Sequence, residues 1–539
     1  MNETNENDDI LKLIPAEQLT TQQKLLLPTP LPLYEMLREP THLDEIDWKK
    51  YKDAAIGRNN STVILCSPYG LDKALEERKC AVFKISGRQL SLCCAIVGET
   101  DAAVAETATF FLSLKQDHRV YSMLEVGWFH DPPNVEFDKA VLSPEQLAQI
   151  LDSNPTRELS LVTGTWTAEQ SVVLASRPNP LNLKLEDGFR FADGGAAYVA
   201  TLEKRQSSFG TLCITGITDG LPFTCGHLKR ICNLNLLDVF GVECLDKECT
   251  RLLFAANVNA LKLSTHAECC SPENFKALNI VPSDIDLDIR GGGEVPELLV
   301  SLFNRVAELG HFERLTLSND KYSDSDPAEG QVVPFDDMRR VVNALIRAIE
   351  ANCKLSYLDL SYSSWAFPWA EHFETIFRAM EEHKGLRTFV VQGRAKKGYT
   401  PNYPRQFDSL WLERLLSRNR NIEVLDCSQG LWSYGPGTDR LYLLNRFYRG
   451  ASVSISEPFA VRPLLVAQAM VNSASDDFQL TALLLSTHVD VFCEWMQDVD
   501  FETSGAAVVV ENGALSVSIP PVSCVLPRRR LAMMNDEAV

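Results

Sequence analysis

The chain lacks the features of exported and membrane proteins. No apolar run reaches the ~18 residues that a membrane span needs. Its first ten residues, MNETNENDDI, have neither the basic start nor the apolar core of a signal peptide. Fifteen cysteines in a chain without export signals indicate reduced thiols. We therefore expect a protein of the cytosol, with the nucleus as the alternative, and no membrane contact.

Positive charge is also in short supply. The 52 basic residues face 72 acidic ones, which gives a net charge of −20. An excess of negative charge repels phosphate groups, so nucleic acid is disfavoured as the general partner.

The motifs of common catalytic and nucleotide-binding sites are missing as well. The chain has no G-x-x-x-x-G-K-[ST], no G-x-S-x-G and no H-E-x-x-H. His488 and Asp490 stand two residues apart in a helical pattern, so they point to different faces. We expect a non-catalytic protein without a cofactor.

Cysteine and histidine gather in one stretch, but without the C-x-x-C spacing of a zinc site. The stretch contains Cys225, His227, Cys232, Cys244, Cys249, His266, Cys269 and Cys270. Cys225 and Cys249 follow expected strands at the distance where neighbouring helices would pack, and buried cysteine acts there as a small apolar side chain. We expect core packing and no metal; zinc is the alternative.

One short unit sets the pattern for the rest of the chain. Its first part, LSYLDLS, places Leu355, Leu358 and Leu360 on one side of a short strand and Asp359 on the other. Its second part carries Phe373, Ile376, Phe377 and Met380 at the spacing of one helix face. Such a unit cannot bury its apolar faces alone, so we expect it to stack on copies of itself. This predicts that Leu358 is core and Asp359 is not.

The same strand pattern recurs along the chain as apolar pairs separated by one residue, most of them followed by a helical pattern. The pairs are Val135/Phe137, Leu159/Leu161, Leu183/Leu185, Leu212/Ile214, Leu237/Val239, Leu261/Leu263, Leu287/Ile289, Leu315/Leu317, Leu358/Leu360, Phe389/Val391, Leu425/Cys427 and Val453/Ile455. Such regular recurrence indicates a repeat architecture, because a chain of 539 residues is too long for one compact core.

A further apolar residue stands three positions before most pairs, as at Phe209, Phe312, Leu355 and Ile422. With this register the chain resembles the leucine-rich-repeat family, and its step length resembles the ribonuclease-inhibitor-like class. The resemblance implies an α/β solenoid, a horseshoe with a parallel concave sheet and outer helices, that acts as a protein-binding scaffold. The whole-chain pattern also resembles an uncharacterised group of algal repeat proteins, which implies no activity.

Composition and pattern predict five segments. Residues 1–55 are expected to be a partly ordered arm, 56–130 a small β-rich domain, and 131–456 the repeats. Residues 457–500 would form a helical C-terminal cap and 501–539 a weakly ordered tail. Helices are expected at 144–153, 196–205, 296–309, 335–351, 371–382 and 407–418.

The expected concave face is acidic. Side chains alternate along a strand, so the residues within and beside each apolar pair should project from this face. They include Glu136, Asp138, Glu158, Glu186, Asp238, Asp286, Asp288, Asp359 and Asp426, against Lys184, Lys262, Arg290 and Arg314. We expect this face to bind a protein or peptide, and its charge favours a basic one.

Two other segments suggest contacts. One is a basic loop, RAKKGYTPNYPRQ, whose candidate residues are Arg394, Lys396, Lys397, Tyr399, Tyr403 and Arg405. This loop is either a solvated insertion or a contact for protein or nucleic acid. The other is residues 26–55, which would serve as the adaptor-binding box if the chain were a substrate-recognition subunit of a ubiquitin ligase. The oligomeric state is left open.

Overall fold

The computed structural model describes residues 10–27, 31–66, 79–87, 91–116, 122–127, 138–215, 220–244, 246–290, 295–319, 335–363, 369–391 and 409–442, with isolated positions beyond. The chain forms two compact units, Met1–Tyr442 and Leu443–Val539. In the second unit, β20 (Val510–Glu511) pairs with β21 (Ala514–Leu515). Most of the expected cap and tail, the pair Val453/Ile455 and the basic loop at 394–406 lie outside the described residues.

The first unit begins with a β-rich module. Its strands are β1 (Leu11–Leu13), β2 (Leu33–Met36), β3 (Ala55–Arg58), β4 (Thr62–Cys66), β5 (Lys79–Gly87), β6 (Ser91–Gly98) and β7 (Ser122–Val126). They pair in the spatial order β1–β2–β3–β4–β6–β5–β7, antiparallel except for β2–β3. Helices α1 (Thr21–Leu26) and α3 (Asp101–Leu112) belong to the same module.

Much of the segment expected to be an arm belongs to this module. Strands β1 and β2 lie within residues 1–55, and Leu43, Ile46 and Trp48 are buried in the core. The Trp48 indole Nε1 donates a hydrogen bond of 2.7 Å to the Leu43 carbonyl. Buried and hydrogen-bonded side chains of this kind fix the segment against the sheet.

The β-rich module and the repeats share one sheet. Strand β7 pairs in parallel with β8 (Glu158–Leu161), with Leu124 opposite Leu159. The parallel series then continues through β10 (Leu181–Leu185), β12 (Gly210–Ile214), β13 (Leu237–Cys244), β14 (Ala260–His266), β15 (Asp284–Arg290), β16 (Arg314–Asn319), β17 (Tyr357–Ser363), β18 (Thr388–Val391) and β19 (Glu423–Asp426). The fold is therefore mixed α/β, with a large and mostly parallel sheet.

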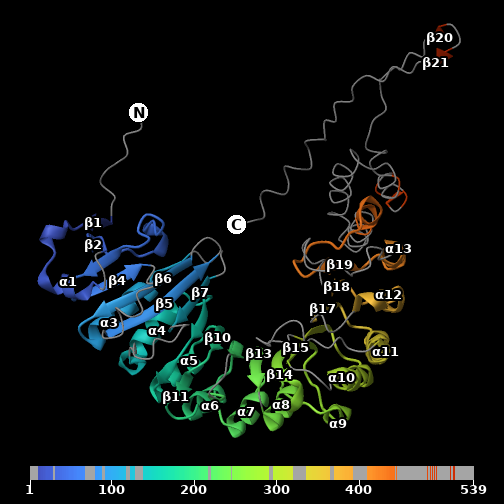
Figure 1. Cartoon of the computed structure of the whole chain (residues 1–539), viewed down its shortest axis with the longest axis horizontal. Coiled ribbons are helices and arrows are strands. Elements are labelled where there is room, and N and C mark those ends of the chain that lie inside the picture. The colour runs from blue at the N-terminus through green and yellow to red at the C-terminus, as the bar shows by residue number, and fades with distance from the viewer. Residues whose placement is uncertain are drawn as a thin grey trace. The chain divides into compact units, whose positions relative to one another are not determined.

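Helices alternate with these strands and lie along one side of them (Figure 1). They are α4 (Pro144–Ser153), α5 (Ala168–Ser176), α6 (Ala196–Leu202), α7 (Cys225–Cys232), α8 (Lys247–Phe254), α9 (Pro272–Lys276), α10 (Val295–Leu309), α11 (Phe335–Ala351), α12 (Phe373–Met380) and α13 (Ser409–Arg418). A small parallel pair, β9 (Gly164–Trp166) and β11 (Phe189–Phe191), stands beside the main sheet. The bounds predicted for α4 and α11 are confirmed, and the other four expected helices differ by one to three residues at their ends.

Apolar side chains at alternate strand positions form the core beneath the helices, as the pairs predict. Leu358 is fully buried, and its strand neighbours Leu315 and Phe389 lie directly opposite it. The prediction that Leu358 is core is confirmed.

The predicted register is wrong at two strands. In β13 the residues that align with Leu212 and Ile214 are Phe240 and Val242, not Leu237 and Val239, because the pairing shifts after Gly210. In β19 the buried residue is Val424, so the expected pair Leu425/Cys427 is displaced by one position. The expected pair Val135/Phe137 lies outside the described residues, and β7 stands at that place in the sheet.

Buried polar side chains fix several turns between a helix and the next strand. Asn352 is fully buried; its Nδ2 donates to Val306 and Ala348 carbonyls at 3.1 and 2.7 Å, and its Oδ1 accepts from the Phe312 amide at 3.0 Å. Asn154 and Asn419 occupy corresponding turns and also donate to buried carbonyl groups. The sequence analysis did not identify these asparagines; their position four residues before a strand is the signal that it missed.

Candidate functional site

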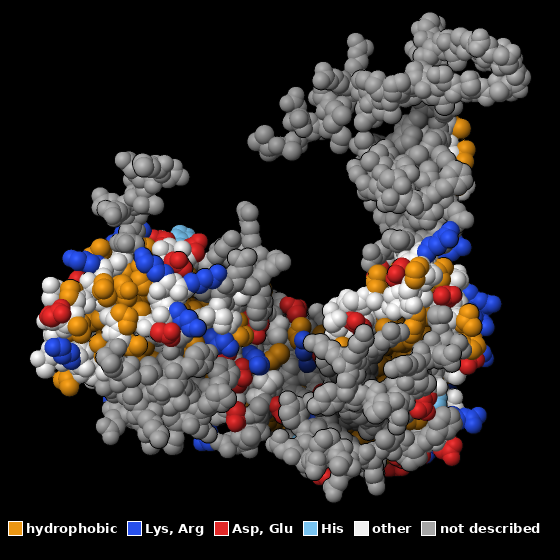
Figure 2. Space-filling view, turned by 45° about the horizontal axis from the view of Figure 1, so that its top comes forward, with side chains coloured by type: hydrophobic (Ala, Val, Ile, Leu, Met, Phe, Trp, Pro, Cys, Tyr) orange, Lys and Arg blue, Asp and Glu red, His pale blue; other side chains and the backbone are white. Residues whose placement is uncertain are grey.

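The candidate site is the side of the sheet opposite the helices, which we call the polar sheet face. It is defined by one register column and the strand positions two residues before and after it. The column contains Lys84, Glu125, Ser160, Lys184, Cys213, Gly241, Lys262, Asp286, Thr316 and Asp359. Across the described surface, Figure 2 shows basic and acidic side chains interspersed rather than separated by sign.

Five of the predicted acids lie on this face. Glu158, Glu186, Asp286, Asp288 and Asp359 occupy the column or its flanking positions. Four of the five are half-buried; Asp359 is buried.

The other predicted acids lie elsewhere. Asp238 is exposed near the start of β13, where the register differs from the prediction, and accepts a 2.8 Å bond from the Ser208 hydroxyl. Asp426 fixes a turn by accepting from the Ser428 and Gly430 amides, both at 2.9 Å. Asp138 caps a short helical turn through the Ala140 amide. Glu136 lies outside the described residues.

The middle of the polar sheet face is a hydrogen-bonded charge cluster. The Asp288 carboxylate accepts from the Ser264 and Ser318 hydroxyls at 2.8 and 2.9 Å, and from Arg290 Nε at 3.1 Å. Arg290 Nη1 also bonds the Glu243 carboxylate. Because neighbouring groups hold each side chain in place, the cluster presents its charges in a fixed arrangement.

A second chain of contacts continues toward β17. Arg314 lies 3.3 Å from the Asp284 carboxylate, and its guanidinium stacks over the Tyr357 ring at 3.9 Å from the centroid. The Tyr357 hydroxyl donates a 3.0 Å bond to Asp359 Oδ2, and the Ser361 amide donates to Oδ1 at 2.8 Å. Burial, together with the nearby Asp359 carboxylate, raises the pKa of Tyr357 to about 12.

The prediction that Asp359 lies outside the core is wrong. Its side chain projects from the predicted side of β17, but the residue is only 4% exposed. The carboxylate is accommodated because two donors satisfy its oxygens. Alternation along a strand gives the direction of a side chain but not what covers it.

Glu125 is a residue that the sequence analysis missed. It stands in the column between Lys84 and Ser160 and is 3% exposed. Burial is the main reason that its pKa rises to about 7; Glu186 adds to the rise, while Lys84 and Lys184 oppose it. Only its place opposite Leu124 in the alternation of β7 could have suggested its orientation.

Lys184 and Lys262 supply positive charge on this face. Lys184 Nζ lies 3.0 Å from the Glu186 carboxylate, which also bonds the Ser160 hydroxyl. Lys262 is exposed and pairs across the strands with Asp286, whose pKa is raised by burial and held down in part by Lys262. Among the described positions of the polar sheet face, acids outnumber bases.

The described cysteines of the 225–270 stretch behave as core or partly buried thiols. Cys232, Cys249 and Cys270 are buried in the main apolar cluster. Burial raises the pKa of Cys232 to about 12. Within the described part of the chain, no three metal-ligating side chains come close enough to hold an ion.

Among the helices that can be described, none combines the length and apolarity of a membrane span. The comparisons with known proteins also give no name: no protein-family model and no curated protein sequence matches this chain.

Proposed function

We propose that the chain is a leucine-rich-repeat solenoid of the ribonuclease-inhibitor-like class and a non-catalytic scaffold for protein–protein interaction. The regular alternation of strands and helices between β8 and α13 supports this assignment, as does the L-x-x-L-x-L register. The buried thiols fit the reducing environment of the cytosol or nucleus.

The observation that carries the proposal is the continuous polar sheet face. From β7 to β19 the strands pair without interruption, and at ~4.8 Å per strand the face extends over roughly 48 Å. Such an extent matches a folded protein or a long peptide better than a metabolite. The charges at Asp288 and Arg290 are held by neighbouring side chains, so a partner would meet an ordered surface.

The excess of acids on this face favours a basic partner. Charged groups at an interface steer association and are screened within about 10 Å at 0.1 M salt. Asp286 and Glu186 are half-buried and Lys262 is exposed, so a partner can reach this part of the face. Binding is therefore expected to weaken as salt is raised.

The alternative as a ubiquitin-ligase subunit is less well supported. An adaptor-binding box in residues 26–55 would need apolar side chains on the surface. Leu43, Ile46 and Trp48 are instead buried in the β-rich module, where they contribute to its core.

The proposal is tested by a photocrosslinking amino acid placed at Lys262 on the polar sheet face, with Lys229, exposed on α7, as the control position. A protein captured from position 262 but not from position 229 supports the proposal. The captured partner is then measured against Asp286→Asn and, as a matched control on α11, Glu350→Gln. Equal capture from both crosslinker positions, or equal affinity for both variants, would contradict binding at this face.

A further inference from the structure

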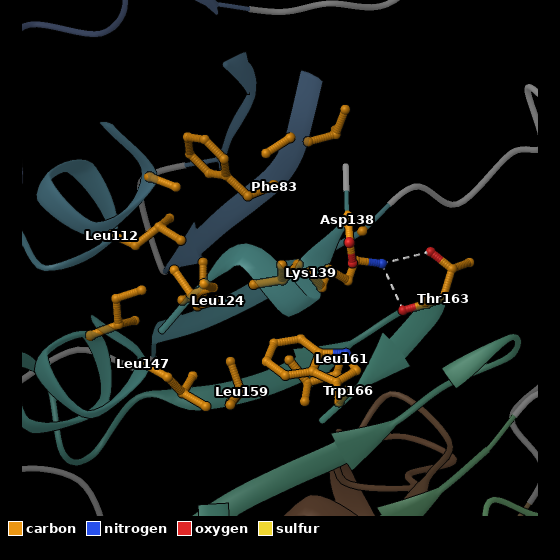
Figure 3. A pocket seen from close by; sticks show the side chains of 18 of the residues that line it. Phe83, Leu112, Leu124, Asp138, Lys139, Leu147, Leu159, Leu161, Thr163 and Trp166 are labelled. Carbon is orange, nitrogen blue, oxygen red and sulfur yellow. Dashed lines mark hydrogen bonds between the residues drawn. The ribbon is translucent and has the colours of Figure 1, made fainter. Parts of the chain in front are cut away.

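An apolar pocket lies between the β-rich module and the first helix-and-strand unit of the parallel series. Its volume is about 260 Å³. Its apolar walls come from β5, α3, β7, α4 and β8 and include Phe83, Leu112, Leu124, Leu147, Leu159 and Leu161 (Figure 3). The predicted scaffold function does not involve this pocket, which is on the helix side of the strands.

Polar groups gather at one end of the pocket. The Lys139 ammonium donates to the Val162 and Thr163 carbonyls at 3.0 and 2.6 Å and to the Thr163 hydroxyl at 3.0 Å. Gly164, with φ +85°, leaves room for this side chain, since a Cβ there would lie 2.7 Å from Lys139 Nζ. These bonds fix a positive charge at the end of an otherwise apolar space.

Trp166 lines the same end, and Figure 3 shows its indole ring beside Lys139. The residue is only 1% exposed, and its Nε1–H has no hydrogen-bond partner. A buried donor without an acceptor costs free energy, and most such groups in folded proteins are satisfied. An acceptor atom brought by a ligand would satisfy it.

The pocket also restricts the size of that ligand. An apolar cavity of about 150 Å³ holds one benzene molecule of six carbons. By the same proportion, 260 Å³ holds a chain of roughly ten carbons.

We propose that this pocket binds a medium-chain acyl compound non-covalently, with the chain in the apolar space and the carbonyl oxygen accepting a hydrogen bond from Trp166 Nε1. The exposed Asp138 carboxylate also lines the pocket and offsets part of the Lys139 charge. Recognition therefore depends on the carbonyl oxygen, which a fatty acid and its ester share.

The pocket contains a thiol, but the thiol is not placed for covalent chemistry. Cys80 is 2% exposed, and burial raises the pKa of its thiol to about 12, so the reactive thiolate is scarce at neutral pH. This supports non-covalent retention of the acyl chain.

The first test measures binding of hexanoate, decanoate, hexadecanoate and methyl decanoate to the full chain by calorimetry. Affinity should rise about three- to fourfold per added carbon up to roughly ten carbons and then level off. Methyl decanoate should bind as well as decanoate to within a few fold. Absence of saturable binding by decanoate, or binding of hexanoate as tight as that of decanoate, would overturn the proposal.

The second test changes the protein. Trp166→Phe should weaken decanoate binding about tenfold by removing one hydrogen bond, whereas Trp432→Phe, a buried tryptophan outside the pocket lining, should leave it unchanged. Ala108→Leu fills the pocket from α3 and should abolish binding, while the same change at exposed Ala102 on α3 should not. If Ala108→Leu does not fold, the tryptophan pair decides; equal affinities in that pair would refute the assigned role of Trp166.

Discussion

Asn352 should be one of the most sensitive positions in the chain. It is fully buried in the turn between α11 and β17 and makes three hydrogen bonds to backbone groups. In Asn352→Ala, the Val306 and Ala348 carbonyls keep other partners, since Gly310 N–H bonds the first and the residue 352 amide bonds the second. The Phe312 amide loses its side-chain acceptor and becomes the main source of the cost.

The magnitude follows from these contacts. Leaving one buried donor unsatisfied costs about 1–3 kcal/mol, and each of the two lost amide bonds contributes about 0.5–1 kcal/mol. The expected loss in the free energy of unfolding is therefore about 3 kcal/mol. Asn352→Asp keeps an acceptor for the Phe312 amide but places a carboxylate against the Val306 and Ala348 carbonyls, so it should be less stable at pH 7 than at pH 4.

Urea unfolding followed by far-UV circular dichroism measures this loss. The matched control is Asn343→Ala, because Asn343 is exposed on the same helix and alanine favours helices. The control should change the free energy of unfolding by no more than about 0.5 kcal/mol. A loss below 1 kcal/mol for Asn352→Ala, or equal losses for the two variants, would refute the reasoning.

Three further results are expected. Asp359→Ala should cost about 2 kcal/mol in urea unfolding, because it leaves the buried Ser361 amide without its acceptor; a change within 0.5 kcal/mol would restore the exposed interpretation of Asp359. Because the pKa of Glu125 is raised to about 7, the folded state holds this proton more tightly than the unfolded state, so stability should fall as pH rises from about 4.5 to 7. Glu125→Gln should flatten that slope in thermal melts at each pH, whereas Glu106→Gln, at an exposed position on α3, should not. In the native protein, Cys232 should react with iodoacetamide at least roughly tenfold more slowly than exposed Cys427, as mass spectrometry of the labelled peptides would show; equal rates would contradict the buried position of Cys232.

Local sequence signals predicted much of the secondary structure. The bounds of α4 follow from a capping box, in which Ser143 and Gln146 satisfy each other's backbone amides, and from proline at the first helical position. The alternation around Leu358 likewise gave the strand and its buried side. These signals depend on residues within one turn or one strand, so a sequence contains them directly.

Register and burial were harder to predict because they depend on neighbouring strands. The run LDVFGV has apolar residues at positions that suit either register, and the pairing shift after Gly210 selects Phe240 and Val242. The burial of Asp359 and Glu125 has no local signal, since it depends on what packs around them. The expected site was consequently right in its sheet face but wrong for Asp238 and Asp426.

The parallel pairing of β7 with β8 determines where the chain can be shortened. Strand β8 has its main-chain groups satisfied by β7 on one side and β10 on the other. A fragment that starts near residue 131, at the expected beginning of the repeats, would uncover an edge of a parallel sheet beside the apolar side chains of Leu159 and Leu161. Exposed edges of this kind pair with other chains and aggregate. Experiments on the repeats are therefore best carried out with the β-rich module retained, because it functions as the protecting end of the sheet.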